Sequence, residues 1–133
     1  MSSNTEDIST VGSLFKALAN KDLAAAADVF HDDATWNHRN NDRHGGVHRG
    51  SDGIMACLGE ATQLTAGTLK AVPQSIMADG AGRVCAVVRL SASRPDGRSM
   101  DGPQIALFTL DDGRVRAVDQ FVGDPDAARE FWA

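Results

Sequence analysis

Apolar residues near the start of the chain recur at the spacing of an amphipathic helix. Between residues 8 and 19 they stand three or four positions apart, at Ile8, Val11, Leu14, Phe15 and Leu18. This spacing predicts a helix with one buried face. The polar segment 20–22 ends the pattern, and Asp22 predicts the N-cap of a second helix over 23–30.

Further along, polar and apolar segments alternate on a shorter scale. Residues 34–39 predict a short strand, and the polar segment 40–46, which ends in glycine, predicts a loop. Ser51 or Asp52 is the expected cap of a third helix over about 53–64.

After Gly67 the pattern changes to β-rich runs. Four strands are predicted, over residues 69–77, 83–93, 104–110 and 114–122. The segments that connect them contain glycine after aspartate, which predicts tight turns and an antiparallel meander. Residues 125–132 predict a short closing helix or tail. Helices followed by a meander indicate an α+β fold, in a single domain over residues 1–133 whose first seven residues are expected to be flexible.

The strand over 83–93 has two different faces. One face is wholly apolar and includes Val88. The other mixes apolar residues with Arg89 and Ser91, and we interpret it as the wall of a partly polar pocket. Residues 105–108 are apolar on both faces, which requires two covered sides. The predicted helices can cover only one side, so a second copy of the chain is the expected partner.

Composition narrows the classes of function. The chain has 133 residues, enough for one domain, and a net charge of −5, which argues against nucleic acid as a partner. No apolar stretch is long enough to span a membrane, and residues 1–6 lack the layout of a signal peptide. A cytoplasmic location is therefore expected. Cys57 and Cys85 are interpreted as small buried residues and not as a disulfide.

Three groups of motifs together resemble a known family. The segments ALANKDL (17–23) and FHDDATW (30–36), then HRGSDGI (48–54), then DGRV (112–115) with the closing Phe131-Trp132, follow one another as in SnoaL-like and ketosteroid isomerase-like domains. These belong to the nuclear transport factor 2-like superfamily. The resemblance covers about residues 8–132. It implies a cone-shaped, curved antiparallel sheet wrapped around the N-terminal helices (a cystatin-like α+β roll), with a deep ligand pocket.

The resemblance also implies which side chains face the pocket. The inward set is Trp36, His38, Val87, Arg89, Ser91, Gln104, Ala106, Phe108, Val118, Gln120 and Val122.

Several family residues are replaced in this chain. The steroid isomerases use a Tyr and an Asp as oxyanion donors, and Leu14 and Ala106 stand at the matching positions. Their proton-shuttling Asp is matched by His38, and the acidic residue of the polyketide cyclases by Gln120. Steroid isomerisation by the family's mechanism is therefore not expected.

His38 and Arg89 are the candidate catalytic residues. A histidine has an ordinary pKa of roughly 6.5, so a neutral imidazole is available near pH 7 to accept a proton. The alternative is a pocket histidine with no chemical role. Arg89 stands among apolar neighbours and would hold a carboxylate or enolate through its planar donors. The alternative is an ion pair with an acid such as Asp119, or exposure to solvent.

The candidate substrate-binding residues are Trp36, Ser91, Gln104, Phe108 and Gln120. Trp36 and Phe108 would stack on a flat ligand or fill the core. Gln104 and Gln120 would orient a carbonyl or satisfy each other. The four histidines match no compact metal motif, so no metal or cofactor is expected. The interpretation is a small-molecule pocket protein, either an isomerase, cyclase or dehydratase that transfers protons, or a noncatalytic binding or interaction domain.

Overall fold

The structure is a computed structural model that describes residues 4–133. Its helices are α1 (Asn4–Ala19), α2 (Leu23–Ala27), α3 (Gly50–Leu64) and α4 (Pro125–Trp132). Its strands are β1 (Phe30–His38), β2 (Gly46–Arg49), β3 (Lys70–Ala78), β4 (Arg83–Ser93), β5 (Ser99–Asp111) and β6 (Arg114–Val122).

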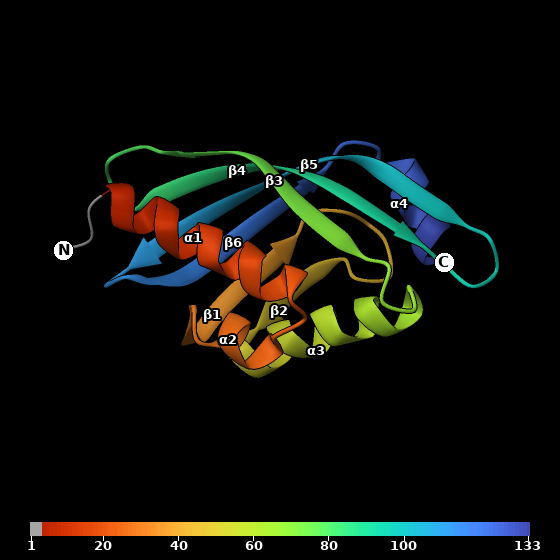
Figure 1. Ribbon diagram of the computed structural model, residues 1–133, viewed down its shortest axis with the longest axis horizontal. Coiled ribbons are helices and arrows are strands. Elements are labelled where there is room, and N and C mark those ends of the chain that lie inside the picture. Colours follow the sequence, from red (N-terminus) through yellow and green to blue (C-terminus); the bar gives the residue numbers. More distant parts are fainter. Residues whose placement is uncertain (1–3) are drawn as a thin grey trace.

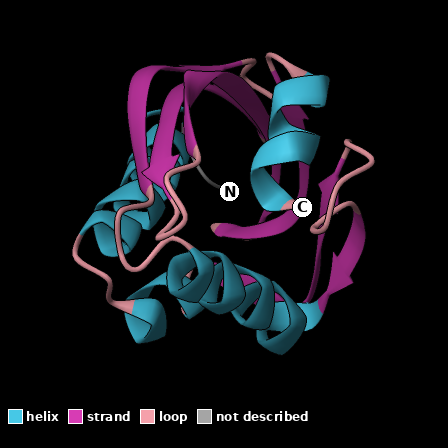
Figure 2. Ribbon diagram, turned by 90° about the vertical axis from the view of Figure 1, so that its right-hand side faces the viewer, coloured by secondary structure: helices cyan, strands magenta, loops and turns pink. Residues whose placement is uncertain are grey.

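All six strands form one curved sheet in the order β2-β1-β6-β5-β4-β3. Helices α1, α2 and α3 lie along its concave side, and α4 lies at one end (Figure 1). Seen from that end, the sheet curls around the interior while α3 lies opposite it (Figure 2). The predicted α+β fold class, with a curved sheet around N-terminal helices, is confirmed.

Several details differ from the sequence-based expectation. The sheet is mixed, because β1 pairs in parallel with β6 while the other pairings are antiparallel. Residues 46–49, for which no strand was predicted, form β2. Helix α3 begins at Gly50, and Arg49 precedes it without a side-chain cap, so the predicted caps at Ser51 or Asp52 are wrong. Residues 4–7 belong to α1, and the expected flexibility also falls on residues 1–3, which lie outside the described residues.

Capping chemistry fixes both short helices. Asp22 Oδ1 accepts a hydrogen bond from Ala25 N at 3.1 Å and starts α2, as its position in the sequence predicted. Asp124 Oδ1 accepts from Ala127 N at 3.1 Å and starts α4, where Pro125 occupies the first helical position. These caps matter to function because α4 presents Trp132 toward the interior.

The core lies between α1 and the concave face of the sheet. Phe108 on β5 is fully buried and meets Phe15 of α1 edge-on, with ring centroids 6.1 Å apart. It also meets Trp36 of β1 edge-on at 6.3 Å. Edge-to-face aromatic contacts of this kind stabilise beyond the area they bury. The aromatic group therefore ties a helix to two strands that are distant in sequence.

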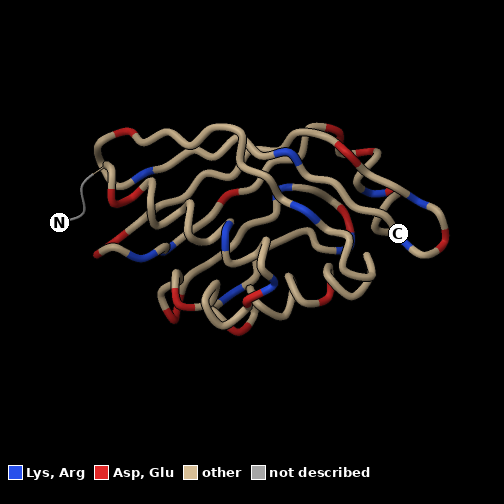
Figure 3. Tube along the Cα trace, viewed as in Figure 1, with Lys and Arg blue, Asp and Glu red and all other residues tan. Residues whose placement is uncertain are grey.

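Charged residues of both signs are interspersed over the described part of the chain (Figure 3). Arg39 pairs with Asp119, Arg89 with Asp101, and Arg116 with Asp111. No helix in the described part is long and apolar enough to cross a membrane.

Replacing Phe108 tests the core. Phe108→Ala is expected to lower the free energy of unfolding by about 3–5 kcal/mol, because it leaves a large cavity between α1 and the sheet. Urea denaturation measures the change. Val47→Ala, at a residue that is 46 % exposed on β2, is the matched control and should change stability by less than about 0.5 kcal/mol. Equal effects of the two substitutions would contradict this placement of the core.

Candidate functional site

A cavity of about 460 Å³ lies between the concave face of the sheet and helices α1 and α3. Its walls are mostly apolar, with Phe15 and Leu18 from α1, Leu58 from α3 and Trp132 from α4. A few polar side chains interrupt this lining. An apolar cavity with a few convergent polar groups is typical of a small-molecule site.

Four of the candidate site residues line this cavity: Trp36, His38, Gln104 and Gln120. The strand register explains why they meet. His38 lies opposite Gln120 in the β1–β6 pair, and Gln120 lies opposite Ala106 in the β5–β6 pair. Directly paired residues share a face of the sheet, and Gln104 shares that face because it lies two positions from Ala106.

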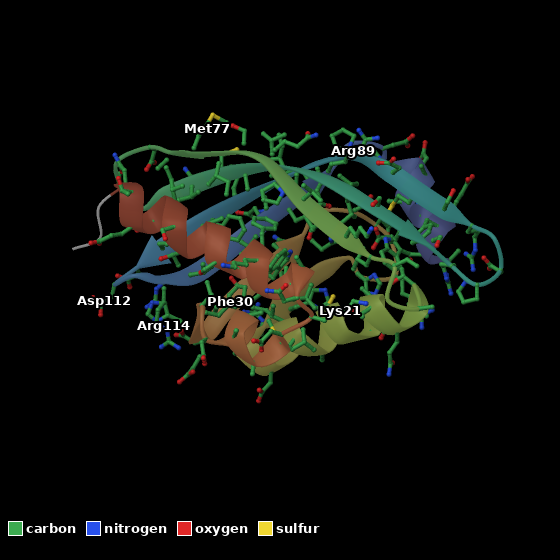
Figure 4. The ribbon with its side chains drawn as sticks, in the orientation of Figure 1. Lys21, Phe30, Met77, Arg89, Asp112 and Arg114 are labelled. Carbon is green, nitrogen blue, oxygen red and sulfur yellow. The ribbon has the colours of Figure 1, made fainter. Side chains whose placement is uncertain are left out.

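Arg89 does not line the cavity, so the prediction that it faces the pocket is wrong. Its side chain is 59 % exposed and forms a two-point ion pair with Asp101, at 2.8 and 2.9 Å. Figure 4 shows it on the side of the sheet away from α1, α2 and α3, as Met77 is. The pKa of Arg89 is raised by the hydrogen bond and the charge of Asp101. Arg89 is thus the solvent-exposed partner of an acid, although the acid is not Asp119.

The cause of the error is strand parity in β4. Gln104 lies opposite Val88, and Pro103 lies opposite Arg89. Arg89 and Gln104 therefore point to opposite faces and cannot line the same pocket. Ser91 shares the face of Arg89 and is also outside the lining. Leu90 of the other face lines the cavity instead.

Phe108 is the last of the substrate-binding candidates. It is fully buried and lies behind Trp36, outside the cavity lining. Of its two interpretations, core filling is the one that the structure shows. Trp36 itself is half-buried and lines the cavity.

His38 forms an ion pair with Asp42, a residue that the sequence analysis did not single out. Nε2 of His38 lies 3.0 Å from Asp42 Oδ2, and the carboxylate side chain has no exposed surface. Burial lowers the pKa of His38, but the hydrogen bond and the negative charge of Asp42 outweigh it, so the pKa lies above 6.5. Burial raises the pKa of Asp42, but the bond to His38 and its charge outweigh this and hold it below 3.8.

The loop after β1 holds Asp42 in place. Its Oδ1 accepts from the backbone N of His44 at 2.8 Å, and its Oδ2 accepts from Asn40 Nδ2 at 2.7 Å. Gly45 allows the loop to close, because a Cβ there would lie 2.1 Å from Asn40 O. The carboxylate is thus oriented by two donors from its own loop, and it in turn orients the imidazole of His38.

A second network has a fixed direction. Trp36 Nε1 can only donate, and it donates to Gln120 Oε1 at 2.7 Å. Because Gln120 Oε1 faces Trp36, Gln120 Nε2 points away from Trp36, and it donates to Gln104 Oε1 at 2.8 Å. Among the described residues nothing accepts from Gln104 Nε2, and Gln104 lines the cavity. The chain of bonds therefore ends in an amide donor in the cavity wall.

His44 and Cys57 also line the cavity and were not predicted to do so. His44 is buried, its ring meets Trp132 edge-on at 4.6 Å, and burial lowers its pKa. Its Nε2 lies 3.5 Å from Glu60 Oε1, too far for a well-formed hydrogen bond. Burial raises the pKa of Cys57 to about 11, so the thiol stays protonated. No group of three or more possible metal ligands occurs within residues 4–133.

The ion pair makes a prediction about pH and stability. A folded-state pKa above 6.5 for His38 contributes stability that is present below 6.5 and lost as the pH rises through the folded value. Asp42 contributes stability above 3.8 that is lost as the pH falls through its lowered pKa. The pair therefore contributes most between these two values. His44 has the opposite dependence to His38, because its pKa is lowered.

The measurement compares the parent with His38→Gln by urea denaturation across this range. The parent should be the more stable below pH 6.5, and its advantage should shrink as the pH rises, because only the imidazolium pairs with Asp42. A difference that does not vary with pH would contradict the ion pair.

Comparisons with known proteins identify the family to which this chain belongs. The model of the SnoaL-like domain matches residues 11–118. An uncharacterized protein of Mycobacterium tuberculosis is 34 % identical over 127 residues, with 96 % of each chain covered. The solved structure of Bal32a, from a soil-derived mobile gene cassette, is 28 % identical and covers 98 % of each chain at a TM-score of 0.94.

A more distant structure shares the fold. A candidate SnoaL-like polyketide cyclase from Jannaschia is 19 % identical, with 99 % of this chain and 94 % of that chain covered, at a TM-score of 0.82. The order of elements and the curved sheet agree with these matches. The chain belongs to the SnoaL-like domain family.

Proposed function

We propose that the protein is a cofactor-independent enzyme that transfers a proton on a small, largely apolar carbonyl compound. Isomerisation, cyclisation and dehydration all fit this chemistry. The observation that carries the proposal is the buried His38–Asp42 pair, in which His38 lines the cavity. An imidazole oriented by a carboxylate accepts a proton readily, because the imidazolium that forms is stabilised by its partner.

In the proposed reaction, neutral His38 removes a proton from the carbon next to the carbonyl. Asp42 holds Nε2, so the other ring nitrogen exchanges the proton. The electron pair moves to the carbonyl oxygen, which accepts a hydrogen bond from Gln104 Nε2. His38 then returns the proton, either to another carbon in an isomerisation or to a departing hydroxyl in a dehydration. All the groups required are side chains, and no cofactor enters.

The donor chain supports the same proposal. Trp36 fixes the orientation of Gln120, which fixes that of Gln104. A donor whose direction is set before the ligand arrives stabilises developing negative charge without reorganising. This series of hydrogen-bonded side chains would take the place of the Tyr and Asp donors of the steroid isomerases, whose positions are occupied here by Leu14 and Ala106.

A noncatalytic ligand-binding domain is the second candidate function. Burial opposes the imidazolium form of His38, but the paired acid Asp42 outweighs burial and favours this form, in which His38 donates and does not accept a proton. A binding protein would use that form together with Gln104 to hold a ligand oxygen. The two functions share one site and differ in whether a proton leaves the ligand.

Proton exchange distinguishes them. With tetralone, an apolar bicyclic ketone, in D₂O, the parent should accelerate exchange of the protons next to the carbonyl, as followed by NMR. His38→Gln should slow this exchange roughly 100-fold or more, since the amide cannot accept the proton. The rate should rise as the pH increases above 6.5, because only neutral imidazole acts as the base.

Arg89→Met is the matched control for this experiment. It removes a charged residue from β4 that lies outside the cavity lining, so exchange should be unchanged. Tetralone that binds in the cavity without any exchange would reject the enzyme in favour of the binding domain. Exchange that survives in His38→Gln would remove His38 from the reaction.

We also propose that two copies of the chain associate through the outer face of the sheet. Val87, Ile105 and Phe121 lie side by side across three strands. Ile105 is 40 % exposed and Phe121 is 43 % exposed. Burying this apolar row against a second copy would supply the cover that the helices do not give.

Light scattering during size-exclusion chromatography tests the dimer. The parent should have twice the 14.1 kDa mass of one chain, and Ile105→Asp should run as a single chain because it places a charge in the interface. Val47→Asp, at an exposed apolar residue on β2, should leave the dimer intact. A parent that runs as a single chain would contradict the proposal.

A further inference from the structure

The charged lining of the cavity has one sign, although the protein as a whole is acidic. The chain carries a net charge of −5, yet no aspartate or glutamate is among the described residues that line the cavity. Lys21 and Lys70 both line it. A cavity with cationic groups in a protein of negative net charge favours an anionic ligand over a cationic one.

Lys21 lies at an unusual backbone position. Its N–H donates to Leu18 O at 3.1 Å, and the N–H of Asp22 donates to Ala17 O at 2.9 Å. These two bonds form a Schellman motif, in which Lys21 is the first residue after the helix cap. Its φ is +57°, a conformation in which glycine is usual and a side chain is strained. A lysine here is conformationally unfavourable, so its side chain is expected to have a role of its own.

The side chain of Lys21 is held at the rim of the cavity. Its Nζ donates to Gly67 O at 2.9 Å, which joins the end of α1 to the loop after α3. A Cβ at Gly67 would lie 2.8 Å from Nζ, so glycine permits this approach. An ammonium has three donors, and Lys21 forms no ion pair with a described residue. Figure 4 shows Lys21 on the helix side of the sheet.

Lys70 contributes positive charge in a different way. It lies opposite Ser91 in the β3–β4 pair, so it shares the sheet face of Arg89. Its position on the edge strand brings it to the rim of the cavity without directing it inward. Lys21 is therefore the residue to which direct contact with a ligand is assigned.

We propose that Lys21 binds an anionic group of the ligand at the mouth of the cavity. Together with the proposed function, on which this inference rests, it defines the substrate class as an elongated apolar acid. Its carbonyl or hydroxyl group reaches Gln104 and His38, and its carboxylate remains at the rim beside Lys21. The apolar walls from α1, α3 and α4 hold the body of the molecule.

A pair of probes tests this assignment. Hydroxybiphenyl carboxylate has a polar group at each end, and its carboxamide has the same shape without the charge. Isothermal titration calorimetry should show that the parent binds the carboxylate about tenfold more tightly than the carboxamide, which is ~1.4 kcal/mol. Lys21→Met should remove this preference and leave carboxamide affinity unchanged. Raising the salt concentration should weaken only the carboxylate.

Two further variants separate charge from structure. Lys21→Gly suits the backbone conformation, so it should stay folded and should also lose the preference for the carboxylate. Lys16→Met removes the same charge from an exposed position on α1 outside the cavity lining and should keep the preference. Equal affinity of the parent for both probes would overturn the assignment, as would an equal loss of affinity for both probes in Lys21→Met.

The outcome can be separated from that of the proposed function. Equal affinities combined with loss of proton exchange in His38→Gln would reject the role of Lys21 and leave the enzyme proposal standing. A preference for the carboxylate without any proton exchange would support Lys21 and reject the enzyme. NMR chemical-shift changes at the indole N–H of Trp36 show that each probe occupies the cavity.

Discussion

The parallel pairing of β1 with β6 is the contact on which the site depends. It aligns Trp36 with Val118 and His38 with Gln120, residues more than half the chain apart. Parallel neighbours cannot be joined by a tight turn, so α3 and the β3–β5 meander must all fit into the connection between them. The same chain path that creates the pairing therefore also supplies the helix and strands that enclose the cavity.

The indole N–H of Trp36 sets the orientation of the polar side chains at one end of the cavity. An indole N–H only donates, so Trp36 sets the orientation of Gln120 and, through it, Gln104. In a buried setting such chains strengthen each bond by polarisation. The ion pair of His38 with Asp42 lies beside this chain, because His38 and Gln120 are directly opposite each other in the β1–β6 pair. The two networks are therefore neighbours at Gln120, and a substitution in one is expected to alter the geometry of the other.

The sequence predicted the fold class and the meander, because helical spacing, turn residues and alternation are local signals. The four candidate site residues that line the cavity were predicted from the family resemblance. Prediction from the sequence failed where the decision was not local. Both faces of β4 carry apolar residues, so alternation alone could not show which face is inside. The register of β4 with β5 places Arg89 on the face opposite to that of Gln104, and therefore outside the cavity. Asp42 and His44 lie in a polar loop whose composition indicates only a connection. The loop reaches the cavity because Asp42 binds His38, a contact that no spacing pattern reports.

Three residues in locally unfavourable positions lie around the cavity, while Asp7 and Asp112 are examples away from it. Lys21 occupies a glycine position, His44 has a buried nitrogen without a well-formed hydrogen bond, and Asp42 is a buried carboxylate. Each of these is unfavourable for folding by itself. The aromatic contacts of Phe108 with Phe15 and Trp36 lie directly behind the site and offset part of that cost. Local conflict at three residues around one cavity, next to a regular core, agrees with a site at which the chain is selected for binding or chemistry as well as for stability.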